Sequence, residues 1–222
     1  MRILYHVPVS APCHKVRIAL GEKKLAYEMK LEKIWERRPD FLAMNPAGEV
    51  PVLVEADGKT LCGSQVICEY LDETQPENSL LGTDALQRAE TRRLVEWFDH
   101  KFYHEVTENL VGEKLMKRIL RLGEPDGSAI RAGLTNIHYH LDYIAFLTGH
   151  RTWLSGDFCS LADITAAAHL STIDYLGDVP WDRHPEAKDW YARMKCRPSF
   201  RPLLAERIPG SPPPKHYDDL DF

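Results

Sequence analysis

The sequence predicts a two-domain α+β fold, in which a mixed α/β half precedes an all-helical half. Strand and helix signals alternate at first, and strand signals vanish after residue 84. A stretch rich in Pro, Asn, Ser and Gly separates the two parts. We therefore place the first domain at residues 1–76, a linker at 77–86, the helical domain at 87–206 and a tail at 207–222.

The first strand, helix and second strand are predicted near the N-terminus. Residues 2–7 are typical of a short buried strand, and Pro8 closes it. In the next segment Val16 and Leu20 share one helical face, and Gly21 can end that helix. Apolar side chains alternate with polar ones over residues 27–31, which predicts the second strand. Because a helix joins these strands, they should be parallel.

Two more strands and a helix complete the first half. Strand signals at residues 52–54 and 60–62 flank the Asp57-Gly58 pair, which is typical of a hairpin turn. The two strands should therefore be antiparallel. Ser64 is expected to cap the helix that follows.

Helical patterns fill the second half. Apolar residues recur every four positions at Leu94, Phe98, Phe102 and Val106, which predicts a long helix. The segment 124–127, Glu-Pro-Asp-Gly, ends this pattern, and a second amphipathic helix runs to about Gly149.

A third helix of the second half should form its centre. The segment Ser160-Leu-Ala-Asp163 is a capping box with Asp in the place of Glu. Residues 164–176 after it are apolar nearly all round, so this helix should be buried. Shorter helices are expected at 187–194 and 200–205.

Charge and composition argue against nucleic-acid binding and membrane insertion. The net charge is −5 and no long basic run exists, so the chain lacks the charge pattern of a nucleic-acid binder. No apolar run approaches the roughly 20 residues of a membrane helix, and direct membrane insertion is not expected. The N-terminus enters a strand directly, without the apolar region of a signal peptide. A cytoplasmic location is therefore expected.

The cysteines and histidines do not form a metal-site or disulfide pattern. Five cysteines are present and no pair has CxxC spacing, which favours a reduced compartment and small core residues. They are Cys13, Cys62, Cys68, Cys159 and Cys196. We interpret His100, His104, His138 and His140 as surface or interhelical residues, and we expect no metal.

Three motifs give the chain a family resemblance. They are Ser10-Ala-Pro-Cys-His-Lys-Val-Arg-Ile-Ala-Leu20, Asn45-Pro-Ala-Gly-Glu-Val-Pro-Val-Leu53 and Ser160-Leu-Ala-Asp-Ile164. Together with the element order they resemble the glutathione-transferase superfamily, over about residues 1–206. The resemblance implies a thioredoxin-like first domain, an all-α helical bundle, a cis peptide bond before Pro51 and a homodimer.

The resemblance also implies a glutathione site with one departure. Ser10 would stabilise the glutathione thiolate, although an ordinary helix cap is an equal alternative. Val50 would offer its backbone to the tripeptide, although the alternative is that this geometry is simply part of the thioredoxin fold and persists without a ligand. Ser64 would receive a carboxylate. Enzymes usually place Glu or Gln where Gly63 stands. Losing that hydrogen bond to the glutamyl ammonium would cost about 1.5–3 kcal/mol, so we interpret the site as vestigial.

Three residues near the site have alternative interpretations. Cys13 could be a reactive thiol at a helix start, but burial is the expected fate. Trp35 could pack against the domain edge or, with Arg37, anchor a partner, since Trp and Arg are enriched in binding hot spots.

The tail is unusual in composition. Its last 12 residues carry one Lys and three Asp, and aromatic residues interleave with the acids. We expect the Pro-rich spacer to hold this segment off the body, so that it binds a partner. A frayed terminus without a role is the alternative. The candidate partner-binding residues are Lys215, His216, Tyr217, Asp218, Asp219, Leu220, Asp221 and Phe222.

The tail and the weakened site resemble a bacterial branch of the superfamily that acts in cell division. This resemblance implies a non-enzymatic partner of FtsZ, the tubulin homologue that polymerises at the division site, with no cofactor. It implies that the chain binds FtsZ filaments, alters their curvature or bundling, and reaches another division protein through the tail. The alternative is an active cytosolic transferase that uses glutathione and Ser10.

Overall fold

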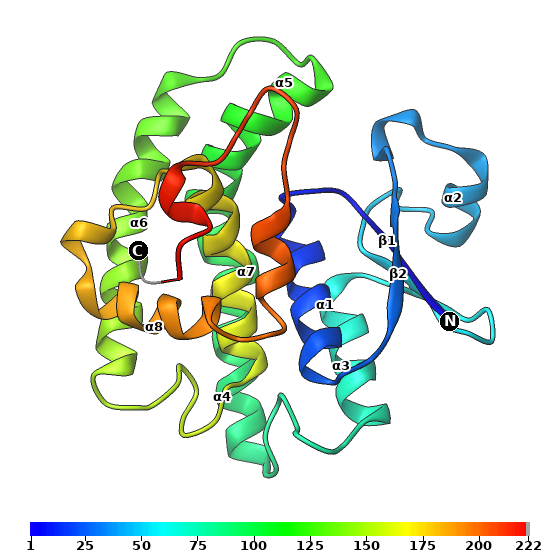
Figure 1. The fold of residues 1–222 in the computed structure, drawn as a ribbon, viewed down its shortest axis with the longest axis horizontal. Helices are drawn as coiled ribbons and strands as arrows, with labels where there is room; N and C mark the ends of the chain where they lie inside the picture. Colours follow the sequence, from blue (N-terminus) through cyan, green and yellow to red (C-terminus); the bar gives the residue numbers. More distant parts are fainter. Residues whose placement is uncertain (221–222) are drawn as a thin grey trace.

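The first half is built on a four-stranded sheet in the order β2-β1-β3-β4 (Figure 1). The strands of the computed structural model, which describes residues 1–220, are β1 (Arg2–His6), β2 (Tyr27–Leu31), β3 (Val52–Val54) and β4 (Thr60–Cys62). Strand β1 is parallel to β2 and antiparallel to β3, and β3 and β4 are antiparallel. The predicted strand directions are confirmed.

Helices cover this sheet and connect its strands. They are α1 (Ala11–Glu22), the 3-10 turn η1 (Ile34–Glu36), α2 (Pro39–Met44) and α3 (Ser64–Thr74). The prediction that Gly21 ends α1 is wrong, because the helix continues to Glu22. A Cβ atom at Gly21 would lie 2.8 Å from the Cβ atom of Ser199. The glycine therefore permits close packing against the second half.

The second half is helical throughout, as predicted. Its elements are α4 (Ala85–Glu96), the π-helical segment η2 (Trp97–Met116), α5 (Lys117–Leu120), α6 (Gly127–Thr148), α7 (Leu161–Leu176), η3 (Trp181–Arg183), α8 (Pro185–Lys195), η4 (Arg201–Ala205) and η5 (Lys215–Tyr217). The four-residue repeat is confirmed as the buried face of α4 and η2. Its members Leu94, Phe98, Phe102 and Val106 are fully buried.

Helix α7 lies at the centre of the molecule. The predicted capping box is present, since the Ser160 hydroxyl accepts a hydrogen bond from the helix start and the Asp163 carboxylate accepts one from the Ser160 N–H. Helices α1 and α7 lie side by side (Figure 1), and one cluster of buried apolar residues runs through both halves. The two halves are therefore packed as one body.

The C-terminal segment, which we define as residues 207–220, folds back over the helical half. It is red in Figure 1, where it leaves η4 beside α1, passes near α5 and returns over the helical half. Arg118 of α5 donates a hydrogen bond to the Gly210 carbonyl at 3.0 Å along this path. No helix among the described residues is both long and apolar enough to cross a bilayer.

Candidate functional site

A cleft of about 780 Å³ opens between the two halves. One wall comes from the end of β1, the start of α1, the residues before β3 and the start of α3. The other wall comes mainly from η2. A hollow of about 360 Å³ adjoins the cleft beside the cis-proline. The structure thus brings together the five residues of the predicted glutathione site, which are Ser10, Val50, Pro51, Gly63 and Ser64.

Ser10 stands at the N-terminus of α1 and lines the cleft. Its hydroxyl makes no hydrogen bond to the helix N–H groups, so the capping interaction expected as the alternative is not formed. A hydrogen bond between Ser10 and the Cys13 thiol partly opposes the effect of burial on that thiol. The role of Ser10 toward a bound thiolate remains a prediction.

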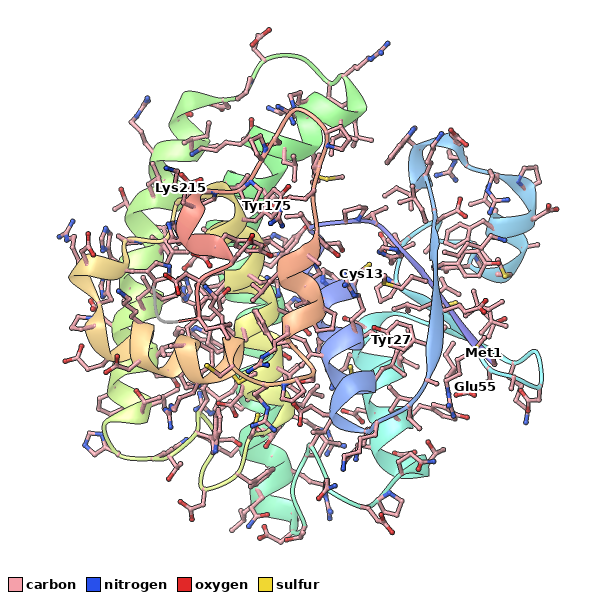
Figure 2. The ribbon with its side chains drawn as sticks, in the orientation of Figure 1. Met1, Cys13, Tyr27, Glu55, Tyr175 and Lys215 are labelled. Atoms are coloured by element: carbon pink, nitrogen blue, oxygen red, sulfur yellow. The ribbon has the colours of Figure 1, made fainter. Side chains whose placement is uncertain are left out.

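Cys13 is a core residue, as expected. It lies on α1 where that helix faces the middle of the molecule (Figure 2), and its side chain is fully buried. Burial raises the pKa of the Cys13 thiol to about 11. The residue is therefore a protonated thiol at neutral pH and a poor nucleophile.

The peptide bond between Val50 and Pro51 is cis, as the family resemblance implies. Pro51 is buried, and its carbonyl accepts a hydrogen bond from the Gly63 N–H at 3.2 Å. Among the described residues, the backbone N–H and C=O of Val50 have no hydrogen-bond partner, and Val50 lines the cleft. This backbone remains available to an extended peptide.

The start of α3 differs from the prediction in its cap. Gly63 is the N-cap and Ser64 is the first helical residue, so the prediction that Ser64 caps α3 is wrong. Gly63 has a φ of +88°, a conformation that favours glycine, and this turn moves the cap back by one residue. A Cβ atom at Gly63 would meet no atom within 4 Å. The space beside Gly63 is therefore open, and Gly63 itself extends no side chain into it.

The charged groups of the cleft are mostly acidic. Its lining includes Glu49, Asp99, Glu108 and Glu113. Burial would raise the pKa of Asp99, but the hydrogen bond from His169 and the charge of Lys15 hold it at about 2. Burial raises the pKa of Tyr103, and the carboxylates of Glu108 and Glu49 raise it further.

The cations near the cleft are engaged by these acids. The Lys15 ammonium donates to Asp99 at 2.6 Å and to Gln65 at 2.8 Å. Lys117 pairs with Glu113 at 2.6 Å. Glutathione is an anion at neutral pH, so this arrangement disfavours its binding.

Trp35 and Arg37 lie at the rim, outside the lining of the cleft. Trp35 is 44% exposed, which favours the partner-anchor interpretation over packing against the domain edge. Arg37 is exposed and closes the η1 turn with a φ of +45°. Their neighbour Ile34 lines the cleft.

The C-terminal segment packs against the body, and the prediction that a spacer holds it off is wrong. Tyr217 is fully buried in the apolar core. Its ring meets that of Tyr175 edge-on, with 5.2 Å between the ring centroids. Figure 2 labels Tyr175 on α7 and Lys215 in the turn η5, to which Tyr217 also belongs.

Hydrogen bonds hold the segment along its length. The Tyr175 hydroxyl donates to the Ser211 carbonyl at 2.8 Å and accepts from the Ile208 N–H at 2.7 Å. His216 contacts the buried carboxylate of Asp174 at 3.1 Å, and Leu220 packs on the core. A frayed terminus is excluded over this segment.

The predicted partner-binding residues of the tail therefore differ in exposure, and His216 and Leu220 are half-buried. Tyr217 is buried and cannot meet a partner in this conformation. Lys215, Asp218 and Asp219 are exposed. Asp221 and Phe222 lie outside the described residues.

The histidines behave as predicted, as surface or interhelical residues. The Trp97 indole donates to His140 at 3.1 Å, and His140 contacts Glu105 at 3.0 Å. His138 contacts His184 at 2.7 Å. Within residues 1–220, no group of three or more His, Cys, Asp or Glu side chains could hold a metal ion.

Two buried charge networks between the halves were not predicted from the sequence. Lys15 reaches Asp99, and Arg17 with His14 reaches Glu206. The available signal was the position of Lys15 and Arg17 beside the apolar residues Val16 and Ile18. A helix packed on several sides must pair any charge that it buries.

Comparison with protein families matches residues 4–79 to the glutathione S-transferase N-terminal domain. Residues 128–198 match the glutathione S-transferase C-terminal domain. FtsZ-localized protein A of Caulobacter vibrioides is 49% identical over 224 residues, which cover 100% of this chain and 98% of the relative.

Two solved structures resemble the whole chain. The crystal structure of a glutathione S-transferase from Rhodospirillum rubrum F11 has a TM-score of 0.98 and 61% identity, and covers 100% of both chains. The structure of FzlA from C. crescentus has a TM-score of 0.96 and 49% identity, and covers 100% of this chain and 99% of that one. Both likenesses extend through the C-terminal segment.

Proposed function

This chain belongs to the glutathione S-transferase family, and we propose that it serves in cell division as a binding protein for FtsZ polymers rather than as a transferase. The observation that carries the proposal is the 49% identity to FtsZ-localized protein A along the entire chain. Identity of this extent, from the first residue to the tail, supports a shared role better than fold alone.

The cleft supports the proposal by what it offers a tripeptide. It retains the cis-proline and the free backbone of Val50. It has glycine where a side chain would meet the glutamyl ammonium, and its lining is acidic. A protein whose work depended on holding glutathione would lose affinity through both features.

We further propose that a homodimer of this body is recruited to the division site and joins or bends FtsZ filaments there. Two copies of one binding surface allow one molecule to contact two filaments and to gain avidity. Sedimentation equilibrium tests the dimer, since it should give twice the chain mass of 25.5 kDa. The exposed acids Asp218 and Asp219 would contact another division protein.

Co-sedimentation tests FtsZ binding and the role of Trp35. The wild-type chain should pellet with FtsZ polymers and remain in the supernatant without them. Trp35→Ala should weaken pelleting by about tenfold to thirtyfold in affinity, the effect of losing a hot-spot Trp. Leu86→Ala is the matched control, because Leu86 is an exposed apolar residue of α4, and it should pellet like the wild type.

Each outcome bears on a different claim. If Trp35→Ala pelleted as well as the wild type, Trp35 would not be the anchor. If the wild-type chain failed to pellet with assembled FtsZ, the proposed function would be wrong.

Restoring the missing side chain should strengthen glutathione binding. Gly63→Gln adds a hydrogen-bond acceptor toward the glutamyl ammonium and should raise affinity by about tenfold to a hundredfold. The added Cβ atom has room, but the φ of +88° should cost about 1 kcal/mol of stability. Isothermal titration measures the affinity and urea denaturation the stability.

Gly58→Gln is the control for this substitution. Gly58 also has a φ of +88° and open space, and it lies in the hairpin turn, outside the cleft. Gly58→Gln should lose as much stability as Gly63→Gln, with no change in glutathione affinity. Equal affinities for both variants and the wild type would show that the missing side chain does not limit binding.

The alternative function is an active transferase. It is favoured by the likeness to the glutathione S-transferase from Rhodospirillum rubrum F11, and by the Ser10 hydroxyl, which lines the cleft and does not cap α1. A thiol-conjugation assay separates the two functions. Turnover that Ser10→Ala abolishes would favour the transferase.

A further inference from the structure

Val9 has an unusual backbone conformation beside the cleft. Its φ is +51°, in the left-handed region that β-branched residues avoid. The residue is 1% exposed, lines the cleft and directly precedes Ser10. A conformation of this kind persists only where surrounding contacts enforce it.

The contact that enforces it comes from the other end of the chain. One carboxylate oxygen of Glu206 accepts a hydrogen bond from the Val9 N–H at 2.8 Å. The two residues are 197 positions apart. A backbone N–H that meets a carboxylate makes a charge-assisted hydrogen bond, which is among the stronger kinds.

Buried side chains fix the Glu206 carboxylate in this position. The oxygen that accepts from Val9 also contacts His14 Nε2 at 3.0 Å, and the other oxygen accepts from Arg17. His14 Nδ1 contacts the Ser171 hydroxyl of α7 at 2.7 Å. Burial would raise the pKa of Glu206, but His14 and Arg17 hold it at about 2, so the carboxylate is ionised.

Glu206 directly precedes the C-terminal segment. The next residue, Arg207, donates hydrogen bonds to the Leu204 and Glu206 carbonyls and pairs with the Asp218 carboxylate. The Ile208 N–H then donates to the Tyr175 hydroxyl at 2.7 Å. The position of the Glu206 backbone therefore depends on how residues 207–220 are seated.

We propose that Glu206 is a positioning residue that holds the Val9–Ser10 loop in its left-handed conformation and couples the seating of the C-terminal segment to the shape of the cleft. A molecule that moves the segment would shift Glu206 and release the loop. Conversely, a molecule in the cleft that requires another loop conformation would loosen the segment. This coupling goes beyond FtsZ binding and acts whichever molecule occupies the cleft.

Amide hydrogen exchange of the full-length chain, followed by NMR, tests the coupling. Glu206→Gln should accelerate exchange of the Val9 amide by about tenfold or more, because the charged acceptor is lost. The amides of Leu4 and Leu53, within the sheet, should exchange as in the wild type. A folded Glu206→Gln protein with wild-type exchange at Val9 would overturn the proposal.

A second variant tests the link to the segment without touching the buried network. Asp218→Asn removes the exposed ion pair with Arg207 and should accelerate Val9 exchange by about twofold or more. Asp57→Asn is the matched control, because it removes the exposed ion pair with Lys59 in the hairpin turn and should leave Val9 unchanged. The same exchange rate of the Val9 amide in Asp218→Asn and Asp57→Asn would overturn the coupling.

A double-mutant cycle tests the strain at Val9. Glycine adopts a positive φ freely, so Val9→Gly should at least halve the shift in denaturation midpoint that Glu206→Gln causes. The same midpoint shift in both backgrounds would show that Glu206 does not hold the loop. Asp218→Asn decides the matter even if Glu206→Gln folds too poorly for the cycle to be measured.

Discussion

Replacing Tyr217 by alanine should lower the free energy of unfolding by about 3–5 kcal/mol, the usual cost of removing a buried aromatic ring. Tyr217 is fully buried, its ring meets Tyr175, and its hydroxyl donates to the Leu203 carbonyl at 3.4 Å. Removing the ring would leave a cavity between the C-terminal segment and α7. Urea denaturation of the full-length variant measures the loss.

Tyr217→Phe is the control for this substitution. It keeps the ring and removes only a long hydrogen bond, so it should cost about 1 kcal/mol. A loss under about 1 kcal/mol for Tyr217→Ala would show that the segment is not part of the core. The composition of the tail led to the opposite expectation, that a Pro-rich spacer holds this segment off the body.

Replacing Asp163 by alanine should cost at least about 3 kcal/mol, because it leaves three buried N–H groups without an acceptor. The carboxylate accepts from the Leu154 N–H at 2.9 Å, the Ser160 N–H at 3.0 Å and the Trp190 indole at 3.0 Å. These donors come from three parts of the helical half. The side chain thus joins the start of α7 to α8 and to the loop before α7.

A cap on the surface provides the comparison. Asp84 accepts hydrogen bonds from the Leu86 and Gln87 N–H groups at the exposed start of α4, so Asp84→Ala should cost about 1 kcal/mol. Asp163→Asn keeps one acceptor oxygen, so its loss of stability should lie between those of Asp163→Ala and Asp84→Ala. If Asp163→Ala cost no more than Asp84→Ala in chemical denaturation, the buried hydrogen bonds would carry little of the stability.

Local patterns predicted most of the fold. The hairpin turn at Asp57-Gly58, the four-residue repeat from Leu94 to Val106 and the Ser160–Asp163 capping box each depend on neighbours within a few positions. The failures at Gly21 and Ser64 shift a helix end by one residue. At Gly21 the deciding contact is tertiary, because the glycine packs against Ser199. At Ser64 the preceding Gly63 forms the turn and takes the cap position.

The charge networks could not be predicted because their partners are distant in the sequence. Lys15 lies 84 positions from Asp99, and Arg17 lies 189 positions from Glu206. The prediction for the tail was wrong for the same reason, because its contacts are also distant in the sequence. Its prolines and acids are typical of an exposed segment, whereas the site that buries Tyr217 includes Tyr175 and Leu203, which no local pattern reveals.

The candidate site was predicted in its location but not in its surroundings. The family motifs placed Ser10, Val50 and Gly63 in one site, and the structure brings them to one cleft. The acidic wall from η2 was not foreseen, because it depends on how the two halves pack. The same packing places Glu206 beside Val9.

The most direct test of the account is co-sedimentation of the purified full-length chain with FtsZ, assembled with GTP or held unassembled with GDP, alongside a glutathione-conjugation assay on the same preparation. The account predicts that the chain pellets only with the assembled polymers and shows no conjugation above background. A chain that stays in the supernatant and conjugates glutathione would contradict it.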